Sequence, residues 1–147
     1  MQETAQGATV LGELETRLRS CREVLFALLF GSRAAGGAPR PGSDWDVAVY
    51  LEEGLSARDR FGVRRRLIAK LEDIEGLAGL DLVVLNDAPA LLGHRALQGE
   101  ILFARDRQAY VRYFVRTLAA SGDEAHYRDL HRKARRRRLG EGTFGRP

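Results

Sequence analysis

The sequence contains one cysteine, Cys21, and no continuous apolar run long enough to cross a membrane. A single cysteine excludes an internal disulfide, and a membrane-spanning helix needs roughly 20 apolar residues in succession. No N-terminal stretch joins a basic start to an apolar core in the manner of a secretory signal. We therefore expect a soluble, cytoplasmic protein with no membrane partner.

Ligands for zinc are also scarce, because the sequence has no cluster of cysteine and histidine residues at zinc-ligand spacing. The chain lacks internal repeats and an interdomain linker, and its 147 residues are enough for one domain with an apolar core. We expect that domain to span residues 1–125. A basic helix end and a disordered tail are expected over residues 126–147.

The net charge of +4 is concentrated near the C-terminus. Residues 126–147 contain eight Arg or Lys and two Asp or Glu, a net +6, which leaves −2 for residues 1–125. The run RKARRRR, from Arg132 to Arg138, is either a nucleic-acid patch or a solvated helix end that docks an acidic partner. Tyr127 is the only aromatic residue within this basic stretch, whereas single-strand binders combine basic grooves with aromatic platforms. Direct nucleic-acid binding is therefore not expected.

Hydrophobic periodicity predicts helices that alternate with strands. An amphipathic helix is predicted over residues 9–22 from the spacing of Val10, Leu11, Leu14 and Leu18. The uninterrupted apolar run VLFALLF, residues 24–30, predicts a strand that is buried on both faces. Residues 44–51 alternate, so that two carboxylates, Asp44 and Asp46, share one face of a second strand. The other face carries Trp45, Val47, Val49 and Leu51.

A second helix and a third strand are predicted next. Ser56 is expected to cap a helix over residues 57–76. Its predicted buried stripe consists of Phe61, Ile68, Leu71 and Ile74. The run LDLVVL, residues 80–85, predicts another apolar strand, and it too is interrupted by an aspartate, Asp81.

The remaining elements are a short helix, a strand and a closing helix. Asn86 or Asp87 is predicted to cap the short helix, which ends at Gly99 and is followed by the strand EILFA. Asp106 is predicted to cap the closing helix. The apolar residues expected on that helix are Tyr110, Phe114 and Leu118.

Carboxylates within apolar strands form the first candidate site. Burying a carboxylate costs free energy, which a divalent cation offsets more fully than a single hydrogen bond. Residues at i and i+2 of a strand lie about 6.6 Å apart at Cα, so Asp44 and Asp46 can converge on two Mg²⁺ ions about 4 Å apart. Asp81 completes this cage if its strand lies alongside with its side chain on the same face. Oxygen ligands alone favour Mg²⁺ or Mn²⁺ over zinc.

The dipeptide Gly31-Ser32, at the end of the first predicted strand, forms the second candidate site. Glycine lets a phosphate approach the backbone, and a strand that enters a helix there exposes N–H groups and a hydroxyl at a positive helix end. Taken singly, Gly-Ser, Asp-x-Asp and a lone strand aspartate are common in turns and caps. Their order and spacing are specific, and a phosphate site beside a two-metal cage indicates nucleotide chemistry.

This order, GSRAAGGAPRPGSDWDVAV followed by LDLVVL, resembles the signature of the polymerase-beta-like nucleotidyltransferase superfamily. The small chain and the run NDAPALLGHRALQGEILFARD look most like the minimal nucleotidyltransferases of HEPN/MNT toxin–antitoxin pairs, the MntA-type antitoxins. The resemblance covers residues 10–120. It implies an α+β fold, a short mixed β-sheet packed with helices, with a C-terminal helix.

The resemblance also implies roles for individual residues. The expected metal ligands and catalytic residues are Asp44, Asp46 and Asp81, and Asp81 would also help to deprotonate the attacking hydroxyl. The expected nucleotide-binding residues are Gly31, Ser32, Arg33 and Ser43. Many relatives have an arginine where this chain has Ala35, and that arginine would steady the triphosphate. Arg33 or Arg40 would have to compensate for its loss.

The implied reaction transfers AMP from ATP, with two Mg²⁺ ions or Mn²⁺, to a tyrosine of a partner HEPN ribonuclease toxin. The chain would act as the antitoxin of that toxin in a hetero-oligomer. A transferase that modifies an aminoglycoside- or lincosamide-like drug is one alternative, although this chain has little surface to enclose a drug. A non-catalytic antitoxin that only masks its partner has no need of three strand carboxylates. An RNA-binding module that uses the basic run is the least favoured alternative.

Overall fold

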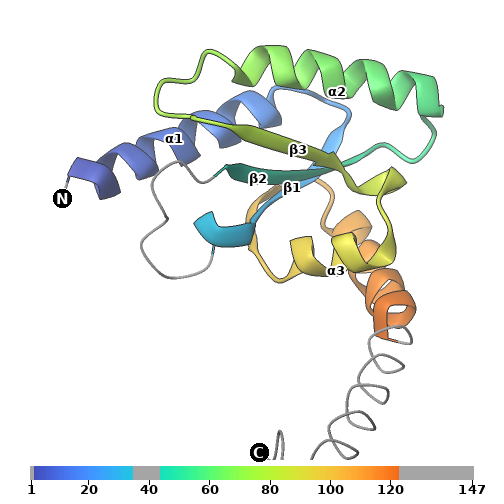
Figure 1. The fold of residues 1–147 in the computed structure, drawn as a ribbon. Helices are drawn as coiled ribbons and strands as arrows, with labels where there is room; N and C mark the ends of the chain where they lie inside the picture. Colours follow the sequence, from blue (N-terminus) through green and yellow to red (C-terminus); the bar gives the residue numbers. More distant parts are fainter. Residues whose placement is uncertain (1, 35–43, 123–147) are drawn as a thin grey trace, which may run out of the picture.

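A computed structural model of the chain describes residues 2–34 and 44–122, which form a mixed four-stranded sheet with helices on both faces (Figure 1). In chain order the elements are α1 (Gln2–Arg19), β1 (Val24–Phe30), the 3₁₀ turn η1 (Gly31–Arg33), β2 (Trp45–Leu51), α2 (Ala57–Leu71), β3 (Leu80–Val84), the 3₁₀ turn η2 (Leu85–Asp87), α3 (Ala90–Leu97) and β4 (Glu100–Ala104). A further helix spans residues 107–122. This arrangement confirms the predicted α+β fold with a helix at its C-terminal side.

The strand order is β3-β2-β1-β4. β1 runs antiparallel to β2 and to β4, whereas β2 and β3 are parallel and are joined by α2, the crossover that a parallel pair needs. β1 is paired on both edges, which agrees with its uninterrupted apolar sequence. Because of these directions, the C-terminal end of β1 lies beside the N-terminal ends of β2 and β3.

The sheet separates two apolar clusters, one under each layer of helices (Figure 1). α1 and α2 cover one face, whose cluster includes four side chains of β2: Trp45, Val47, Val49 and Leu51. α3 and helix 107–122 cover the other face, where Ala48 and Tyr50 of β2 pack. The predicted alternation of β2 is therefore confirmed. Asp44 and Asp46 have the parity of Ala48, so they belong to the α3 face.

The buried face of α2 matches the predicted one only in part, because Leu71 and the following Ile74 are buried as predicted whereas Phe61 is not. Ser56 caps the helix as predicted, and its hydroxyl accepts a hydrogen bond from the Asp59 amide (3.1 Å). The helix ends at Leu71, and its buried side chains are Val63, Leu67 and Leu71. Phe61 is 59% exposed, because it lies two residues before Val63 and therefore about 200° away around the helix.

The predicted side-chain cap of α3 is wrong. Pro89 occupies the capping position, and no side chain caps the helix. Asn86 instead binds the end of β2: its Oδ1 accepts from the Leu51 amide (2.8 Å) and its Nδ2 donates to the Leu51 carbonyl (2.9 Å). Asp87 forms an ion pair with Arg60 of α2 (2.6 Å). These contacts tie η2 to β2 and α2, and so they fix where the chain enters α3.

Helix 107–122 begins as predicted, because Asp106 Oδ1 accepts a hydrogen bond from the Ala109 amide (3.0 Å). Its buried row is shifted by one position from the predicted row, and contains Ala109, Tyr113, Thr117 and Ser121, while Leu118 is 40% exposed. The predicted tail, with its basic run, lies outside the described residues. No helix in the described part of the chain is long and apolar enough to span a membrane.

Candidate active site

The three aspartates lie near one another at the end of the sheet where β1 stops and β2 and β3 begin. Asp46 and Asp81 are registered partners in the parallel pair, and Asp46 is also the partner of Phe30, the last residue of β1. Asp44 directly precedes β2. Registered neighbours in a sheet project to the same face. The structure thus places Asp81 on the face that carries Asp46, as the predicted cage required.

The carboxylates of this cluster repel one another. The pKa of Asp46 is raised, first by partial burial and then by the negative charges of Asp81 and Asp44. The positive charge of Arg95, on α3, opposes this rise in pKa. Acids held together with so little positive charge favour a bound cation, because the cation removes their mutual repulsion.

The donor set fits a divalent metal ion. Carboxylate oxygens without nitrogen or sulfur ligands suit Mg²⁺ or Mn²⁺. Across residues 2–34 and 44–122, no three Asp, Glu, His or Cys side chains are already gathered around one point. Asp44 and Asp81 are exposed, so turning their side chains toward Asp46 costs little. Asp44, Asp46 and Asp81 are therefore the residues that would hold the metal.

Gly31 lies directly against the Asp46 carboxylate. Its φ is +74°, which glycine adopts without strain, and an added Cβ would stand 2.1 Å from Asp46 Oδ2. Gly31 begins η1, which closes with a hydrogen bond from the Ala34 amide to the Gly31 carbonyl (3.2 Å). Ser32 is exposed on this turn. A phosphate here would rely on backbone amides and the Ser32 hydroxyl, since η1 is a single 3₁₀ turn and supplies no long helix dipole.

A second glycine has the same relation to Asp44. Gly79 has a φ of +73°, and an added Cβ would stand 2.2 Å from Asp44 Oδ1. The Gly79 carbonyl also accepts a hydrogen bond from the Trp45 amide (2.8 Å). Sequence reasoning missed Gly79, although its place directly before the Leu80 strand was the available signal.

Arg33 lies against the core rather than among the carboxylates. Its guanidinium stacks over the Trp45 ring, 4.6 Å from the ring centroid. Trp45 belongs to the cluster under α1 and α2, on the opposite face of the sheet from Asp46. Ser43, Ala35 and Arg40 lie outside the described residues. Arg95 was not singled out from the sequence, yet its charge reaches Asp46.

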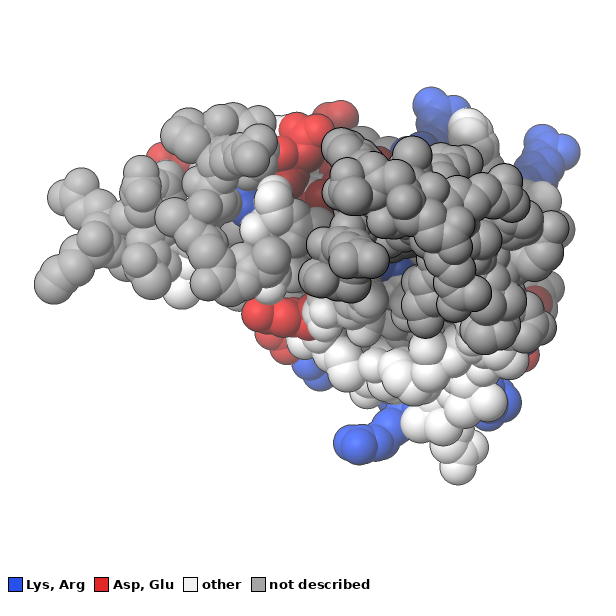
Figure 2. Space-filling model, turned by 60° about the horizontal axis from the view of Figure 1, so that its bottom comes forward, with Lys and Arg blue, Asp and Glu red and all other residues white. Residues whose placement is uncertain are grey.

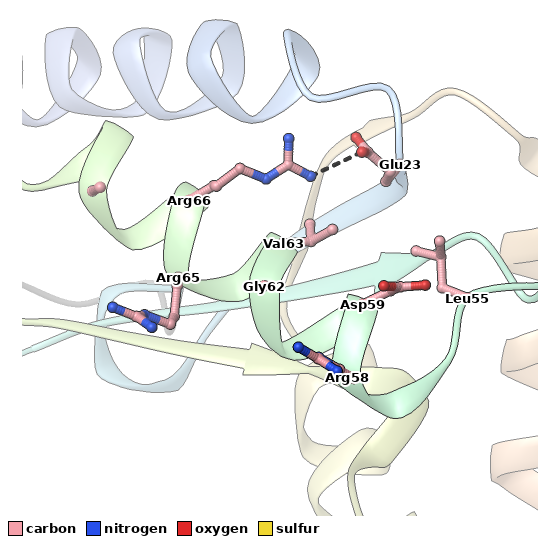
Figure 3. Close-up of a pocket in the computed structure, with 9 residues that line it drawn as sticks. Glu23, Leu55, Arg58, Asp59, Gly62, Val63, Arg65 and Arg66 are labelled. Carbon is pink, nitrogen blue, oxygen red and sulfur yellow. Dashed lines mark hydrogen bonds and ion pairs between the residues drawn. The ribbon is translucent and has the colours of Figure 1, made fainter.

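An open hollow of about 760 Å³ lies elsewhere, along α2 (Figure 3). Arg66 and Glu23 form an ion pair across it (2.9 Å), and Arg58 and Arg65 also line it. Glu23 precedes β1, whereas Gly31 follows it. The hollow lies along α2, on the opposite face of the sheet from Asp46, and none of the candidate site residues lines it, so it is not part of the site.

Charges differ between parts of the α3 side of the molecule. In Figure 2, where the lower side of Figure 1 is turned forward, acidic residues show as separate groups, the two largest at the upper edge and lower down near the middle of the molecule's width, and basic residues stand mainly near the edge. A polyphosphate that approaches carboxylates meets repulsion unless cations lie between them. Metal ions and arginine side chains are the available sources of that positive charge.

Residues 13–108 match the family model described as polymerase beta, nucleotidyltransferase. The chain belongs to this family, which confirms the predicted superfamily, and the matched range contains Gly31, Asp44, Asp46 and Asp81. No curated protein sequence matches the chain.

Solved structures with the same fold come from toxin–antitoxin systems. A mutant MntA-HpeT toxin–antitoxin is 22% identical with a TM-score of 0.55, and the match covers 90% of this chain and 97% of that one. A toxin–antitoxin with AMP-PNP is 22% identical with a TM-score of 0.54, and the match covers 90% of this chain and 97% of that one. A complex of tri-AMPylated Shewanella oneidensis HEPN toxin with MNT antitoxin is 20% identical with a TM-score of 0.53, and the match covers 93% of this chain and 98% of that one. At these identities the likeness concerns the fold.

The raised pKa of Asp46 predicts how the metal-free protein responds to pH. A carboxyl whose pKa is higher in the folded state than in the unfolded state stabilises the fold when protonated, and this contribution is lost as the pH rises through the folded pKa. We expect Asp46→Asn to raise the melting temperature at neutral pH in EDTA, and the gain to shrink as the pH falls toward about 4. Glu75→Gln, at an exposed site, is the control. A lower melting temperature for Asp46→Asn at neutral pH would contradict this account.

Proposed function

We propose that this chain is an antitoxin that transfers AMP from ATP to a tyrosine hydroxyl of a HEPN-family toxin, in a reaction that requires Mg²⁺ or Mn²⁺. The observation that carries the proposal is the placement of Asp44, Asp46 and Asp81 at one end of the sheet, with Gly31 against Asp46, in a polymerase beta nucleotidyltransferase domain. The similar structures with AMP-PNP and with an AMPylated HEPN toxin support ATP as the donor and a HEPN protein as the acceptor.

The proposed chemistry divides the work among the three carboxylates. Asp44 and Asp46 would hold the metal ion that binds the triphosphate, and Gly31 leaves room for both Asp46 and a phosphate oxygen. Asp81 accepts the proton of the tyrosine hydroxyl and later releases it to solvent. The phenolic oxygen forms a bond to the α-phosphorus while the bond from that phosphorus to the β-phosphate oxygen breaks, and pyrophosphate leaves. Bound Mg²⁺ would neutralise the triphosphate and the departing pyrophosphate.

The exposed position of Asp81 and Asp44 suits a protein acceptor. Both residues are exposed, Asp44 just before β2 and Asp81 near the start of β3, whereas Asp46 is half-buried. A tyrosine presented by a partner can therefore approach the outer carboxylate without entering a deep pocket. Adding AMP to that tyrosine places charge and bulk on the toxin, which is the proposed basis of its silencing.

The test uses the purified chain and the HEPN-family protein encoded beside it. With ATP labelled at the α-phosphate and Mg²⁺, we expect label on the partner and a mass increase of one AMP, which disappears in EDTA and when the acceptor tyrosine is changed to phenylalanine. Asp46→Asn should bind the partner yet transfer no label. Neutralisation of the toxin by Asp46→Asn as complete as by the wild type would instead identify a masking antitoxin.

A further inference from the structure

Close packing of α3 on β1 brings one arginine to the acidic end of the sheet. Gly99, just after α3, lies so close to β1 that an added Cβ would stand 2.0 Å from the Leu29 carbonyl oxygen and 2.8 Å from Phe30 Cα. Phe30 is the registered partner of Asp46. Arg95 lies in the last turn of α3, next to the buried Ala96 and four residues before Gly99, and α3 covers the face of the sheet that carries Asp46.

The Arg95 guanidinium is exposed and makes no ion pair or hydrogen bond with the described residues. Its charge nevertheless acts on Asp46, which places it within electrostatic range of the carboxylates without neutralising any of them directly. Within the described part of the chain, no side chain or backbone group occupies its donors, which are therefore available to a ligand. A guanidinium is suited to phosphate, because its planar fork donates two parallel hydrogen bonds to a pair of oxygens.

A second arginine of the described residues near this end of the sheet has a different role. Arg33 stacks on Trp45, on the opposite face, where it holds η1 against the core. The chain also has Ala35 where an arginine was expected from its resemblance to the family. Of the arginines in the described ranges, Arg95 is the one whose charge lowers the pKa of Asp46.

We propose that Arg95 binds the β- and γ-phosphates of the nucleotide, so that the cation for the triphosphate comes from α3. This inference rests on the proposed function, because it assumes a nucleoside triphosphate at the three aspartates. The side chain lies outside the carboxylate cluster and on the same face, so it can contact the phosphates that extend away from the α-phosphorus. Arg95 therefore discriminates between ATP and AMP, because AMP has no β- or γ-phosphate.

The test compares nucleotide affinities of the full-length chain by calorimetry. We expect Arg95→Gln to raise the Kd for Mg-ATP by about tenfold or more, since it loses charge-assisted hydrogen bonds to phosphate. The Kd for Mg-AMP should change by less than about twofold, because AMP lacks the phosphates concerned. Arg95→Lys should recover part of the loss, because it restores the charge but not the fork. The melting temperature should not change.

Arg65→Gln is the matched control, since Arg65 is also a helix arginine without a described partner and lines the remote hollow on α2 (Figure 3). It should leave both affinities unchanged.

Equal binding of Mg-ATP by Arg95→Gln and by the wild type would overturn the role of Arg95 while the proposed function stood. If the wild type and Arg65→Gln bind no Mg-ATP, the proposed function fails. In that case, the affinity for Mg-tripolyphosphate tests Arg95. If Arg95 belongs to an anion site, Arg95→Gln must bind Mg-tripolyphosphate more weakly than the wild type. Equal affinities, or no binding by the wild type, would overturn the inference.

Discussion

Asp46→Asn is expected to reduce AMP transfer by at least ~100-fold, and Asp44→Asn should have an effect of similar size. Each substitution removes a negative metal ligand while keeping the side-chain volume. Both variants should therefore also bind Mg-ATP more weakly. Asp46→Asn should remain folded, since the neutral amide removes the repulsion that Asp81 and Asp44 exert on this position.

Asp81→Asn should behave differently from these two variants. If Asp81 acts mainly on the acceptor hydroxyl, the variant retains most Mg-ATP binding and loses transfer. Calorimetry, transfer of labelled AMP and the melting temperature, measured on the same preparations, separate binding, chemistry and folding. Asp59→Asn, in the first turn of α2 and remote from the site, should leave transfer unchanged. A folded Asp81→Asn that transfers AMP within a few-fold of the wild type would require another residue as the base.

The positions of the three aspartates were predictable because strand geometry is local. The alternation of β2 alone assigns Asp44 and Asp46 to one face, and the apolar run around Asp81 indicates a neighbouring strand. The register that pairs Asp46 with Asp81 depends on the parallel pairing of β2 with β3. The periodicity of either strand alone does not determine that pairing. The sequence therefore could not predict that Asp81 shares a face with Asp46, and the predicted cage depended on it.

Helix faces were less predictable, since α2 carries more than one apolar row. One row contains Phe61 and Ile68, and another contains Val63 and Leu67. Only the packing of α2 against the sheet and α1 selects the second row and leaves Phe61 in solvent. Helix 107–122 shows the same effect, because a shift of one residue turns a helix face by about 100°.

Site residues outside the strands were missed for a related reason. Gly79 and Arg95 approach the carboxylates through a turn and through α3, whose positions depend on contacts between distant segments. Arg33, in contrast, lies next to Gly31 in the sequence but stacks on Trp45 on the far face. Proximity in sequence to the Gly-Ser turn therefore did not determine which arginine reaches the acidic end of the sheet.

Gly31→Ala is expected to lower AMP transfer by about 100-fold or more while the protein remains folded. The new Cβ would stand 2.1 Å from Asp46 Oδ2, and the carboxylate, as the end of a side chain, would turn away. The left-handed φ of +74° adds about 1–2 kcal/mol of strain in alanine, so the melting temperature should fall moderately. Transfer of labelled AMP and thermal unfolding measure the two effects separately.

Two other glycines provide the controls for this prediction. Gly62→Ala, within α2 and with nothing within 4 Å of the added Cβ, should raise stability by up to about 1 kcal/mol and leave transfer unchanged. Gly99→Ala should prevent normal folding, since its Cβ meets the backbone of Leu29 and Phe30, which cannot turn aside.

A double-mutant cycle then isolates the collision at Gly31. If displacement of the Asp46 carboxylate causes the loss, Gly31→Ala should weaken Mg-ATP binding far less in an Asp46→Ala background than in the wild type. Fully additive losses would instead assign the defect to the strained backbone of η1.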